Sequence, residues 1–221
     1  MTDNKSAFSS SEYDRNIRDT VPFYEDFFVQ IADAVRARKS DAVSWLDVGC
    51  GTGEMARTVL NNIGIERFVF CDSSEKMLAV AESRSAAPNT EFIRADIRSL
   101  PYNEEFDVVT AIMINHYFGV NDRVKAVRNC FNALKSDGMY FCFENFAPTE
   151  NLTELYLKRW RQFQLERGRS KEECERHISR YGKEYFPITI NGEINIIKSC
   201  GFRAAEILWV SCMQAGFLAI K

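Results

Sequence analysis

The chain has 221 residues, 46% of them hydrophobic and 13% aromatic, and it carries a formal net charge of −3. This length suits one large domain, or one domain with an insertion, with enough apolar residues to fill a sizeable core. The acidic balance weighs against a broadly basic nucleic-acid surface.

Seven cysteines and two histidines show neither a disulfide framework nor a zinc pattern. The number of cysteines is odd, no pair is spaced C-x-x-C, and Cys71 and Cys142 lie inside apolar runs, where a thiol behaves as a small hydrophobic group. Such cysteines indicate a reducing compartment. No apolar leader opens the chain and no apolar run reaches about 18 residues, so we expect a cytoplasmic protein without a membrane span or a metal.

The N-terminal region is expected to be helical after a polar start. Residues 1–11 are polar and Ser-rich, which predicts a mobile tail. Residues 13–37 follow a helical pattern that Pro22 divides into two pieces, with an apolar stripe from Ile17 to Val35.

From residue 43 onward, strands and helices alternate. The apolar pattern predicts strands at 43–48, 67–71, 91–95, 106–114 and 139–143, and helices at 54–62, 74–84 and 122–134. Ser73 or Ser74 is the expected cap of the helix at 74–84. Continuous apolar strands in a βαβα order are typical of an open, doubly wound parallel sheet, which gives an α/β fold class.

The last third of the chain departs from this order. Residues 150–186 are amphipathic and rich in basic residues, and we expect them to form a helical cap inserted into the domain. A helix at 190–199 then leads to strands at 206–212 and 216–220. Their short link predicts an antiparallel C-terminal hairpin.

A glycine-rich turn follows the first strand. It reads Asp47-Val48-Gly49-Cys50-Gly51-Thr52-Gly53 and leads into a helix. Glycine permits the positive φ angles and close ligand approach of such a turn, and the helix N-terminus offers free N–H groups. The third glycine arrives one residue earlier than in a dinucleotide-binding G-x-G-x-x-G motif, and Glu54 would repel a pyrophosphate. A ligand without phosphates therefore fits this loop better.

This heptapeptide resembles the D-x-G-x-G-x-G signature of class I S-adenosylmethionine-dependent methyltransferases. The resemblance implies a Rossmann-like, seven-stranded, mostly parallel sheet in residues 39–221 and S-adenosyl-L-methionine as the cofactor. The methionine part of the cofactor would lie over the loop, against Gly49, Cys50, Gly51 and Gly53.

Three aspartates stand at the carboxyl ends of predicted strands, where a doubly wound sheet binds its ligands. Asp72 follows the loop by about twenty residues, a position from which a carboxylate can accept hydrogen bonds from ribose hydroxyls. By resemblance, Asp47 orients the loop and approaches the ammonium of the cofactor. The same resemblance assigns the adenosine part of the cofactor to Asp96, Ile97, Met77 and Ser73.

The segment that closes the strand at 106–114 faces the sulfonium in methyltransferases of this type. It contains Asn115, assigned to the cofactor, and His116. The His116 imidazole can act as a general base for the acceptor, and the alternative is that it only packs there. The second histidine, His177, lies in the polar insert and is expected to be exposed to solvent.

The N-terminal helices allow two interpretations. Residues 1–38 form either a plain amphipathic unit packed on the sheet or a lid over the cofactor. In the second interpretation Tyr13, Arg18 and Tyr24 reach inward to the cofactor, and Tyr24 is also a candidate catalytic group beside His116.

Scattered residues near both ends resemble one branch of the superfamily, the carboxy-S-adenosylmethionine synthases of the tRNA wobble-uridine oxyacetate pathway. These residues are Thr20-Val21-Pro22 with Tyr24, and the final strands with Trp209 and Cys212. By the same resemblance Tyr24 contacts the methionine end of the cofactor. Two features differ. The chain keeps an ordinary Gly51-Thr52-Gly53 turn, and Arg180 stands one residue beyond the position of that branch's carboxylate-binding arginine, a shift of about 100° on a helix.

Ordinary methyl transfer to a small-molecule acceptor is therefore the predicted function. The cap and the N-terminal helices would form the acceptor pocket, lined by Trp160, Phe163, Tyr181, Tyr185 and Phe186. The alternatives are a carboxy-S-adenosylmethionine synthase, a tRNA-modification methyltransferase that uses the basic insert, and a non-catalytic cofactor-binding partner subunit. The oligomeric state is open, with a homodimer among the alternatives.

Overall fold

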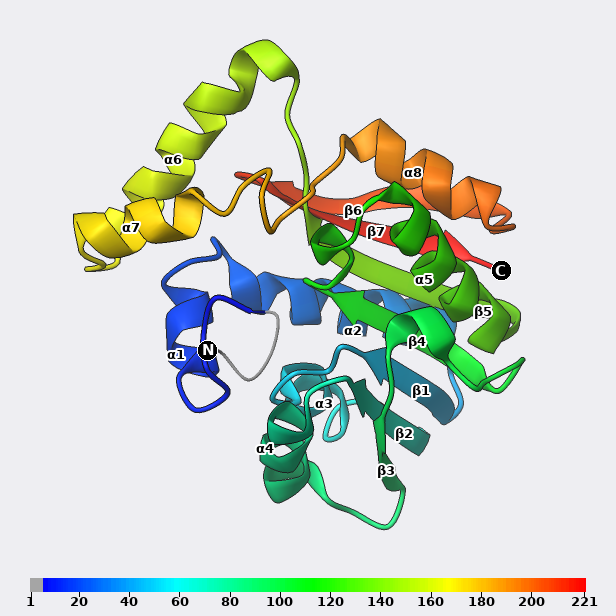
Figure 1. Cartoon of the computed structure of the whole chain (residues 1–221). Coiled ribbons are helices and arrows are strands. Elements are labelled where there is room, and N and C mark those ends of the chain that lie inside the picture. The colour runs from blue at the N-terminus through cyan, green and yellow to red at the C-terminus, as the bar shows by residue number, and fades with distance from the viewer. Residues whose placement is uncertain (1–5) are drawn as a thin grey trace.

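The computed structural model describes residues 6–221, and its centre is a seven-stranded sheet with helices on both faces (Figure 1). The strand order is β3-β2-β1-β4-β5-β7-β6, in which β7 runs antiparallel to both β5 and β6 and the remaining pairs are parallel. The α/β fold class and the antiparallel C-terminal hairpin predicted from the sequence are thus confirmed. The strands are β1 Val43–Val48, β2 Ile65–Asp72, β3 Thr90–Arg94, β4 Phe106–Ile112, β5 Leu134–Asn145, β6 Ala204–Ser211 and β7 Gln214–Ile220.

Eight α-helices and three short 3-10 turns accompany these strands within residues 6–221. The helices are α1 Tyr13–Arg18, α2 Tyr24–Arg38, α3 Glu54–Val59, α4 Glu75–Ser85, α5 Val120–Ala133, α6 Thr153–Glu166, α7 Lys171–Ile178 and α8 Ile190–Ser199. The 3-10 turns are η1 Ile97–Ser99, η2 Asn115–Tyr117 and η3 Glu150–Leu152. None of the helices in this part of the chain is long and apolar enough to span a membrane.

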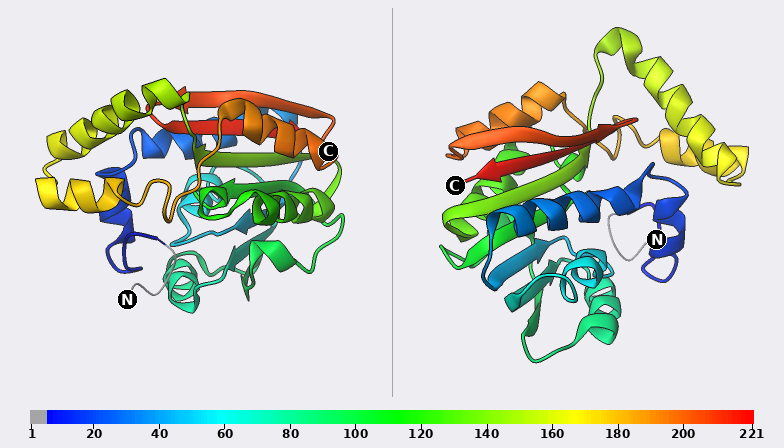
Figure 2. Two further views of the ribbon diagram at one scale, coloured as in Figure 1. Left: turned by 45° about the horizontal axis from the view of Figure 1, so that its top comes forward. Right: turned by 180° about the vertical axis from the view of Figure 1, so that it is seen from behind.

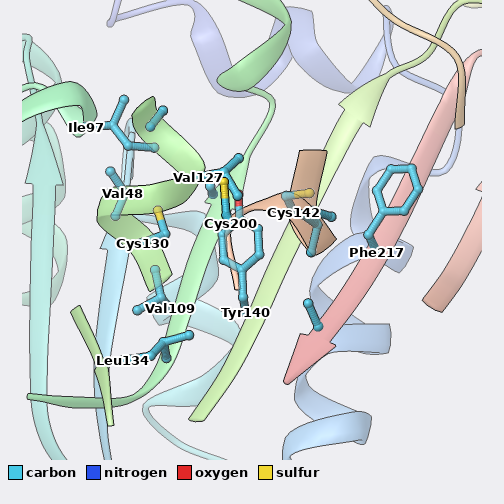
Figure 3. Close-up of a cluster of buried hydrophobic side chains, with 14 of the residues drawn as sticks. Val48, Ile97, Val109, Val127, Cys130, Leu134, Tyr140, Cys142, Cys200 and Phe217 are labelled. Carbon is cyan, nitrogen blue, oxygen red and sulfur yellow. The ribbon is translucent and has the colours of Figure 1, made fainter. Parts of the chain in front are cut away.

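The core is divided into two layers by the sheet, because neighbouring side chains of each strand point to opposite faces. In β1, Leu46 packs into the cluster that contains α5 and α8, while Trp45 packs into the cluster beneath α2, α3 and α4. Figure 3 shows the first of these clusters, with Cys130 from α5 and Cys142 from β5 among its members. The sheet is therefore covered on both faces, which explains its continuous apolar strands.

The N-terminal helices have different surroundings. The inner face of α2 is completely buried against the sheet through Phe27, Phe28, Ile31 and Val35. The short helix α1 instead lies beside α6 and α7 at one end of the sheet (Figure 2). Trp160 of α6 donates a hydrogen bond from its indole to the Thr20 carbonyl at 2.7 Å, which joins the cap to the segment after α1. Residues 6–12 and α1 therefore lie at the carboxyl ends of the strands, whereas most of α2 packs on the face of the sheet.

Two expectations for local structure are corrected. Part of the predicted tail is packed rather than mobile: Phe8 stacks near His177, while residues 1–5 lie outside the described part of the chain. Strand β5 begins at Leu134, five residues before the expected start. Residues 135–138 interrupt its pairing with β4, which passes from Leu134 to Met139, and Asp137 in this stretch has a φ of 63°, unusual for a residue other than glycine. The turn-like sequence is therefore an irregularity inside a longer strand.

Candidate functional site

The glycine-rich turn after β1 is shaped by positive φ angles and by close neighbours. Gly49 has a φ of +67°, and a Cβ placed on it would lie 2.4 Å from Cδ1 of Ile114. Gly53 has a φ of +85° and caps the N-terminus of α3. Both positions therefore require glycine, because a side chain would meet both strain and crowding.

Asp72, at the end of β2, fixes this turn and keeps acceptor capacity. Its Oδ2 accepts a hydrogen bond from the Gly51 N–H at 2.9 Å, and its Oδ1 accepts one from the Ser74 N–H at 2.8 Å. The Ser73 N–H is a third backbone donor, and because a carboxylate can accept about four bonds, Asp72 keeps acceptor capacity for a ligand. Burial raises the pKa of Asp72, and its backbone hydrogen bonds oppose that shift. The arrangement suits a pair of neighbouring hydroxyls.

Asp47, at the end of β1, is a buried carboxyl group supported by one hydrogen-bond chain. The Trp45 indole donates to Thr110 Oγ1 at 3.0 Å, and Thr110 Oγ1 in turn donates to Asp47 Oδ1 at 2.7 Å. Because the indole is only a donor, it fixes the direction of the threonine hydroxyl. Burial, more than any other cause, raises the pKa of Asp47 to about 7. A buried carboxyl group of this kind is stabilised in its charged form by a cation.

The next strand end forms a slot for a flat group. Met77 and Ile97 are almost fully buried and line one cavity together with Phe118 and Asp96. Arg98 binds the Asp96 carboxylate at 2.7 Å, and its guanidinium lies 5.3 Å from the centre of the Phe118 ring. Apolar side chains above and below with a carboxylate at the edge can hold an aromatic base that carries an amino group.

Tyr13 of α1 connects the cavities of this region. It lines the cavity beside Asp72, a second cavity between the glycine-rich turn and Tyr24, and a third one at the tip of β4. Its side chain is hydrogen-bonded to that of Tyr24. Tyr13 is therefore a wall that the three cavities share.

The third cavity, called the chamber from here on, contains a histidine bound to a buried glutamate. The chamber is lined by Ser6, Ala7, Phe8, Tyr13, Ile17, Val21, Met113, His116, Tyr117, Asn145, Trp160, His177 and Tyr185. His116 Nδ1 lies 2.7 Å from Oε2 of Glu144, which also accepts the His116 N–H at 3.1 Å. Glu144 Oε1 accepts the N–H groups of Asn115 at 2.9 Å and Ile114 at 3.3 Å. A carboxylate only accepts hydrogen bonds, so Nδ1 carries the proton and Nε2 is the basic nitrogen of neutral His116.

The tyrosines around the chamber are poor candidates for proton transfer. Burial raises the pKa values of Tyr13, Tyr24 and Tyr185, and it raises the pKa of Tyr117 to about 12. These phenols stay neutral at physiological pH and act as hydrogen-bond donors. Among the side chains of the chamber, His116 is thus the best placed to accept a proton.

The expectation that His177 is exposed to solvent is wrong. Its side chain is 6% exposed and packs edge-on against Trp160, with ring centres 4.9 Å apart. Burial, followed by the nearby charges of Arg169 and Arg180, lowers the pKa of His177 to about 3. The second histidine is therefore neutral and part of the chamber, because α7 turns this side of the insert inward.

Most of the residues singled out from the sequence lie together, but three do not line the cavities. Arg18 forms ion pairs with Glu54 and Glu25. Asn115 is fully buried, and its side chain donates to the Tyr140 hydroxyl at 3.1 Å. Gly53 packs against α4 and β2. The residues that do line cavities are Tyr13, Tyr24, Asp47, Gly49, Cys50, Gly51, Asp72, Ser73, Met77, Asp96, Ile97 and His116.

Sequence reasoning missed several residues of the site. Phe118 belongs to the same apolar-to-aromatic segment as His116, so its position after β4 was a usable signal. Glu144, at the end of β5, gave a weaker signal in the sequence. It is 28 residues from His116, and only the pairing of β4 with β5 brings the two together. Arg98 could be found only through its contact with Asp96.

Comparison with known proteins places this arrangement among methyltransferases. The family model described as a methyltransferase domain matches residues 46–138. The carboxy-S-adenosyl-L-methionine synthase of Staphylococcus epidermidis is 21% identical over 98% of this chain and 96% of its own length. The demethylmenaquinone methyltransferase of Thermotoga maritima is 34% identical, over 53% of this chain and 52% of its own length.

A solved structure shows the same fold. Human N-acetylserotonin methyltransferase in complex with S-adenosylmethionine aligns with a TM-score of 0.66 at 16% identity, covering 96% of this chain and 56% of that one. At this level of identity the likeness concerns the fold alone.

Proposed function

This chain belongs to the class I S-adenosylmethionine-dependent methyltransferase superfamily, and from that premise we propose that it methylates a small molecule held beside His116. S-Adenosyl-L-methionine is its cofactor. What is proposed is the role of each residue and the kind of acceptor. A cytoplasmic location belongs to the proposal too, supported by seven cysteines without disulfides, six of them buried.

The observation that carries the proposal is that Tyr13 lines all three cavities, which places them next to one another. Asp72 would accept the ribose hydroxyls, and the slot between Met77 and Phe118 would hold the adenine. Asp47 would face the ammonium group, whose charge matches a buried carboxyl group that lacks a cation among the described residues. This order leaves the reactive sulfur beside Tyr13, at the entrance of the chamber.

Bound S-adenosylmethionine supplies a methyl group that its sulfonium charge activates. His116 Nε2 would take the proton that the nucleophilic atom of the acceptor loses when it is methylated. Glu144 holds the imidazole in this tautomer and orientation through the 2.7 Å contact at Nδ1. Glu144 is thus a positioning residue.

The acceptor itself is placed beside the chamber because of the chamber's lining. Walls from α1, α6 and α7 and from the tip of β4 surround the space, whose volume of about 20 Å³ holds about one water molecule, so an acceptor enters only when α1 or the cap moves away. Two of the residues predicted to line the acceptor pocket, Trp160 and Tyr185, line the chamber. Phe163, Tyr181 and Phe186 are not among its lining residues.

The role of His116 can be tested without knowing the acceptor. Purified protein is incubated with methyl-labelled S-adenosylmethionine and a low-molecular-weight cell extract, and label in the small-molecule fraction is measured. We expect His116→Gln to lower transfer by about 10²–10⁴-fold, the usual range for a general base, with cofactor affinity retained. Glu144→Gln should lower transfer less. Equal transfer by His116→Gln and the wild type would make His116 a packing residue.

A second candidate is synthesis of carboxy-S-adenosylmethionine. It is favoured by relatives of that name that match this chain over nearly its full length. Arg180 lies near the chamber, with its guanidinium 4.6 Å from the centre of the Tyr185 ring. Mass spectrometry of the ligand released on denaturation separates the two. S-Adenosylmethionine or its demethylated product supports methyl transfer, and a species heavier by one carboxyl group supports the synthase.

A further inference from the structure

A groove beside the chamber is far larger than the chamber itself. It lies between residues 6–16, which include α1, and residues 169–184, which include α7, and we call it the outer groove. Its volume is about 510 Å³, within the range of about 300–1,000 Å³ that small-molecule sites occupy. The cavities assigned to the cofactor lie elsewhere, beside Asp72 and Asp47. The roles proposed so far therefore leave this space unused.

The lining of the outer groove is positively charged, although the chain as a whole has a net charge of −3. Four arginines line it against three glutamates, and His177 is neutral because its pKa is lowered to about 3. Burial is the largest cause of that shift, and the charges of Arg169 and Arg180 add to it. The positive field of the arginines thus extends to the buried side of the groove.

The three glutamates of the lining are engaged with other partners. Glu12 pairs with Arg15 at 3.7 Å, and Glu184 pairs with Arg180 at 2.9 Å. Glu173 belongs to the capping box at the N-terminus of α7. Within residues 6–221, these pairings leave two arginines of the lining without a carboxylate partner.

Arg169 and Arg176 are these two arginines, and the first is held in place across the groove. Its guanidinium donates a hydrogen bond to Asn16 Oδ1 at 3.3 Å and lies 5.4 Å from the centre of the Phe8 ring. Both contacts are with residues of the opposite wall, so the guanidinium lies between the two walls. Its buried Nε has no hydrogen-bond partner among residues 6–221. Arg169 is therefore a positioned cation whose charge no carboxylate in this part of the chain neutralises.

The outer groove shares a wall with the chamber. The residues that line both are Ser6, Ala7, Phe8 and His177. Because the chamber has a volume of only about 20 Å³, an acceptor that approaches from this side keeps most of its atoms in the groove. Its reactive group reaches His116 when residues 6–8 move away. The sulfonium of the bound cofactor is a cation, and it attracts an acceptor that carries negative charge.

We propose that the outer groove is an oxyanion site centred on Arg169, with Arg176 as a second cation, and that it holds a carboxylate or phosphoryl group of the acceptor. This inference rests on the proposed function and adds a substrate class to it, an anionic small molecule. A guanidinium forms charge-assisted hydrogen bonds with either group. The group in the groove is not the one that is methylated, so the product keeps its negative charge.

Inorganic phosphate and acetate are the probes for the site, added to the full chain at constant ionic strength set with sodium chloride. The Nε–H signals of arginine in ¹H–¹⁵N NMR spectra report on binding, and the Arg169 signal is the one that disappears in Arg169→Gln. We expect at least one of the two anions to move this signal, and the tighter one identifies the chemical group. Ammonium chloride, a cation control, should leave the signal in place.

Charge-removing variants should change the affinity for the tighter anion in opposite directions, as measured from the backbone amide signals of residues 169–180. Arg169→Gln should weaken binding about tenfold, the loss of a charge-assisted hydrogen bond. Arg176→Gln should weaken it less, about threefold, because exposed charges are screened. Glu12→Gln removes a negative charge from the lining and should tighten binding. The control is Lys171→Gln on α7, which removes an exposed cation outside the groove and should bind the anion like the wild type.

The charge of the acceptor is tested with methyl-labelled S-adenosylmethionine and the low-molecular-weight cell extract. The reaction mixture is passed over an anion-exchange resin at about pH 7, where unreacted S-adenosylmethionine, a cation, flows through. We expect the labelled product to be retained by the resin and released by salt.

Several outcomes would overturn the inference. These are an Arg169 signal that neither anion moves, equal anion affinity in Arg169→Gln, Arg176→Gln and the wild type, and a labelled small-molecule product that the resin does not retain. Each of these leaves the proposed function standing. The absence of any labelled small molecule has a different meaning, because it would overturn the proposed function itself.

Discussion

At the scale of a single residue, the ionisation of Asp47 is expected to make cofactor affinity depend on pH. With a pKa of about 7 raised by burial, the carboxyl group holds its proton in a large part of the unliganded molecules at neutral pH. An ammonium group beside it favours the charged form, so binding releases a proton below about pH 7. We predict that the affinity for S-adenosylmethionine increases as the pH is raised. The increase is up to tenfold per pH unit below about pH 7, and the affinity is constant at higher pH.

Calorimetry at about pH 6 and pH 8, in buffers with different ionisation enthalpies, measures this proton release. Asp47→Asn is the matched control, because an amide keeps the shape and can still accept the hydrogen bond from Thr110. The variant should bind S-adenosylmethionine more weakly than the wild type at high pH, and its affinity should not change with pH through residue 47. A wild-type affinity that is flat between these pH values would contradict the account of Asp47.

His177 affects acid stability in a predictable direction. Its pKa is lowered to about 3 in the folded protein, against 6.5 for an unperturbed histidine. Above pH 6.5 both states are neutral and the residue contributes nothing. Below it only the unfolded state binds the proton, so the free energy of unfolding falls by about 1.4 kcal/mol per pH unit until about pH 3.

Urea denaturation from about pH 7 to pH 4 tests this slope. His177→Phe removes the titrating group, so the difference in stability between the variant and the wild type should shift in favour of the variant as the pH falls. If the two proteins lose stability in parallel, His177 is accessible to protons in the folded state.

The residues that could be predicted from the sequence are those that local pattern determines. The glycine-rich turn and Asp72 stand directly after apolar strands, so their place at the sheet edge follows from the order of elements alone. The environment of His177 depends instead on Trp160, Phe8 and Tyr185, which are distant in sequence. Charged neighbours in the insert made it look exposed, and only the packing of α7 shows otherwise.

At the scale of elements, a buried ion pair fastens the segment between α7 and α8 to the site. Arg123 of α5 and Glu193 of α8 are nearly inaccessible and form an ion pair at 2.6 Å. Arg123 also donates to the Phe186 carbonyl at 2.7 Å, while the Phe186 N–H donates to the His116 carbonyl at 2.7 Å. The pair therefore helps hold Tyr185, the neighbour of Phe186, against the His116 imidazole.

Replacing only one member of the pair Arg123–Glu193 should lower the free energy of unfolding. Arg123→Met leaves Glu193 buried without its cation, and removing one partner of a buried pair usually costs about 3–5 kcal/mol. The double variant Arg123→Met with Glu193→Leu removes both charges and should recover most of that loss. Chemical denaturation measures the stability of the single and the double variant. A single variant as stable as the wild type would show that water reaches the pair.

Strand and helix positions were predicted well where one periodicity dominates, as in β1 and α5. The start of β5 was not, because Lys135-Ser136-Asp137-Gly138 has the composition of a turn. Tertiary contacts override it: Lys135 pairs with Asp107, and Asp137 pairs with Arg203. Such contacts link elements that the pattern of one segment does not reveal.

At the scale of the whole molecule, α1 is attached to the sheet by polar contacts and by the buried Ile17, whereas the inner face of α2 belongs to the core. Asp14 accepts hydrogen bonds from Thr52 and from Arg84, each at 2.5 Å, and Arg18 pairs with Glu54. Pro22 and Phe23 separate the two helices, and Phe23 has a φ of 55°, a conformation that is costly for a bulky residue. The partly exposed pair of Asp14 with Arg84 is individually weak, so we expect α1 to open more readily than α2.

We predict that S-adenosylhomocysteine slows amide hydrogen exchange in residues 13–20 far more than in residues 27–35. Asp14→Asn weakens the contact with Arg84 and should speed exchange in α1 without changing exchange in α2. Mass spectrometry of peptides from the two helices reads both at once. Equal protection of the two helices would mean that α1 and α2 open together as one unit.

The fold as a whole could be predicted because its signals repeat along the chain, strand after strand. The acceptor could not, because the chamber is assembled from α1, the cap and the tip of β4, and no motif spans these segments.

The most direct test of the account is the affinity of S-adenosylmethionine for the wild type and for Asp72→Ala, measured by calorimetry at about pH 8, where Asp47 is ionised. Loss of the Asp72 carboxylate leaves the ribose hydroxyls without their acceptor and should cost about 1–3 kcal/mol, or roughly 5- to 150-fold in affinity. Tight binding by the wild type with that loss in the variant is the predicted result. Equal affinity of the two proteins, or no binding by the wild type, would contradict it.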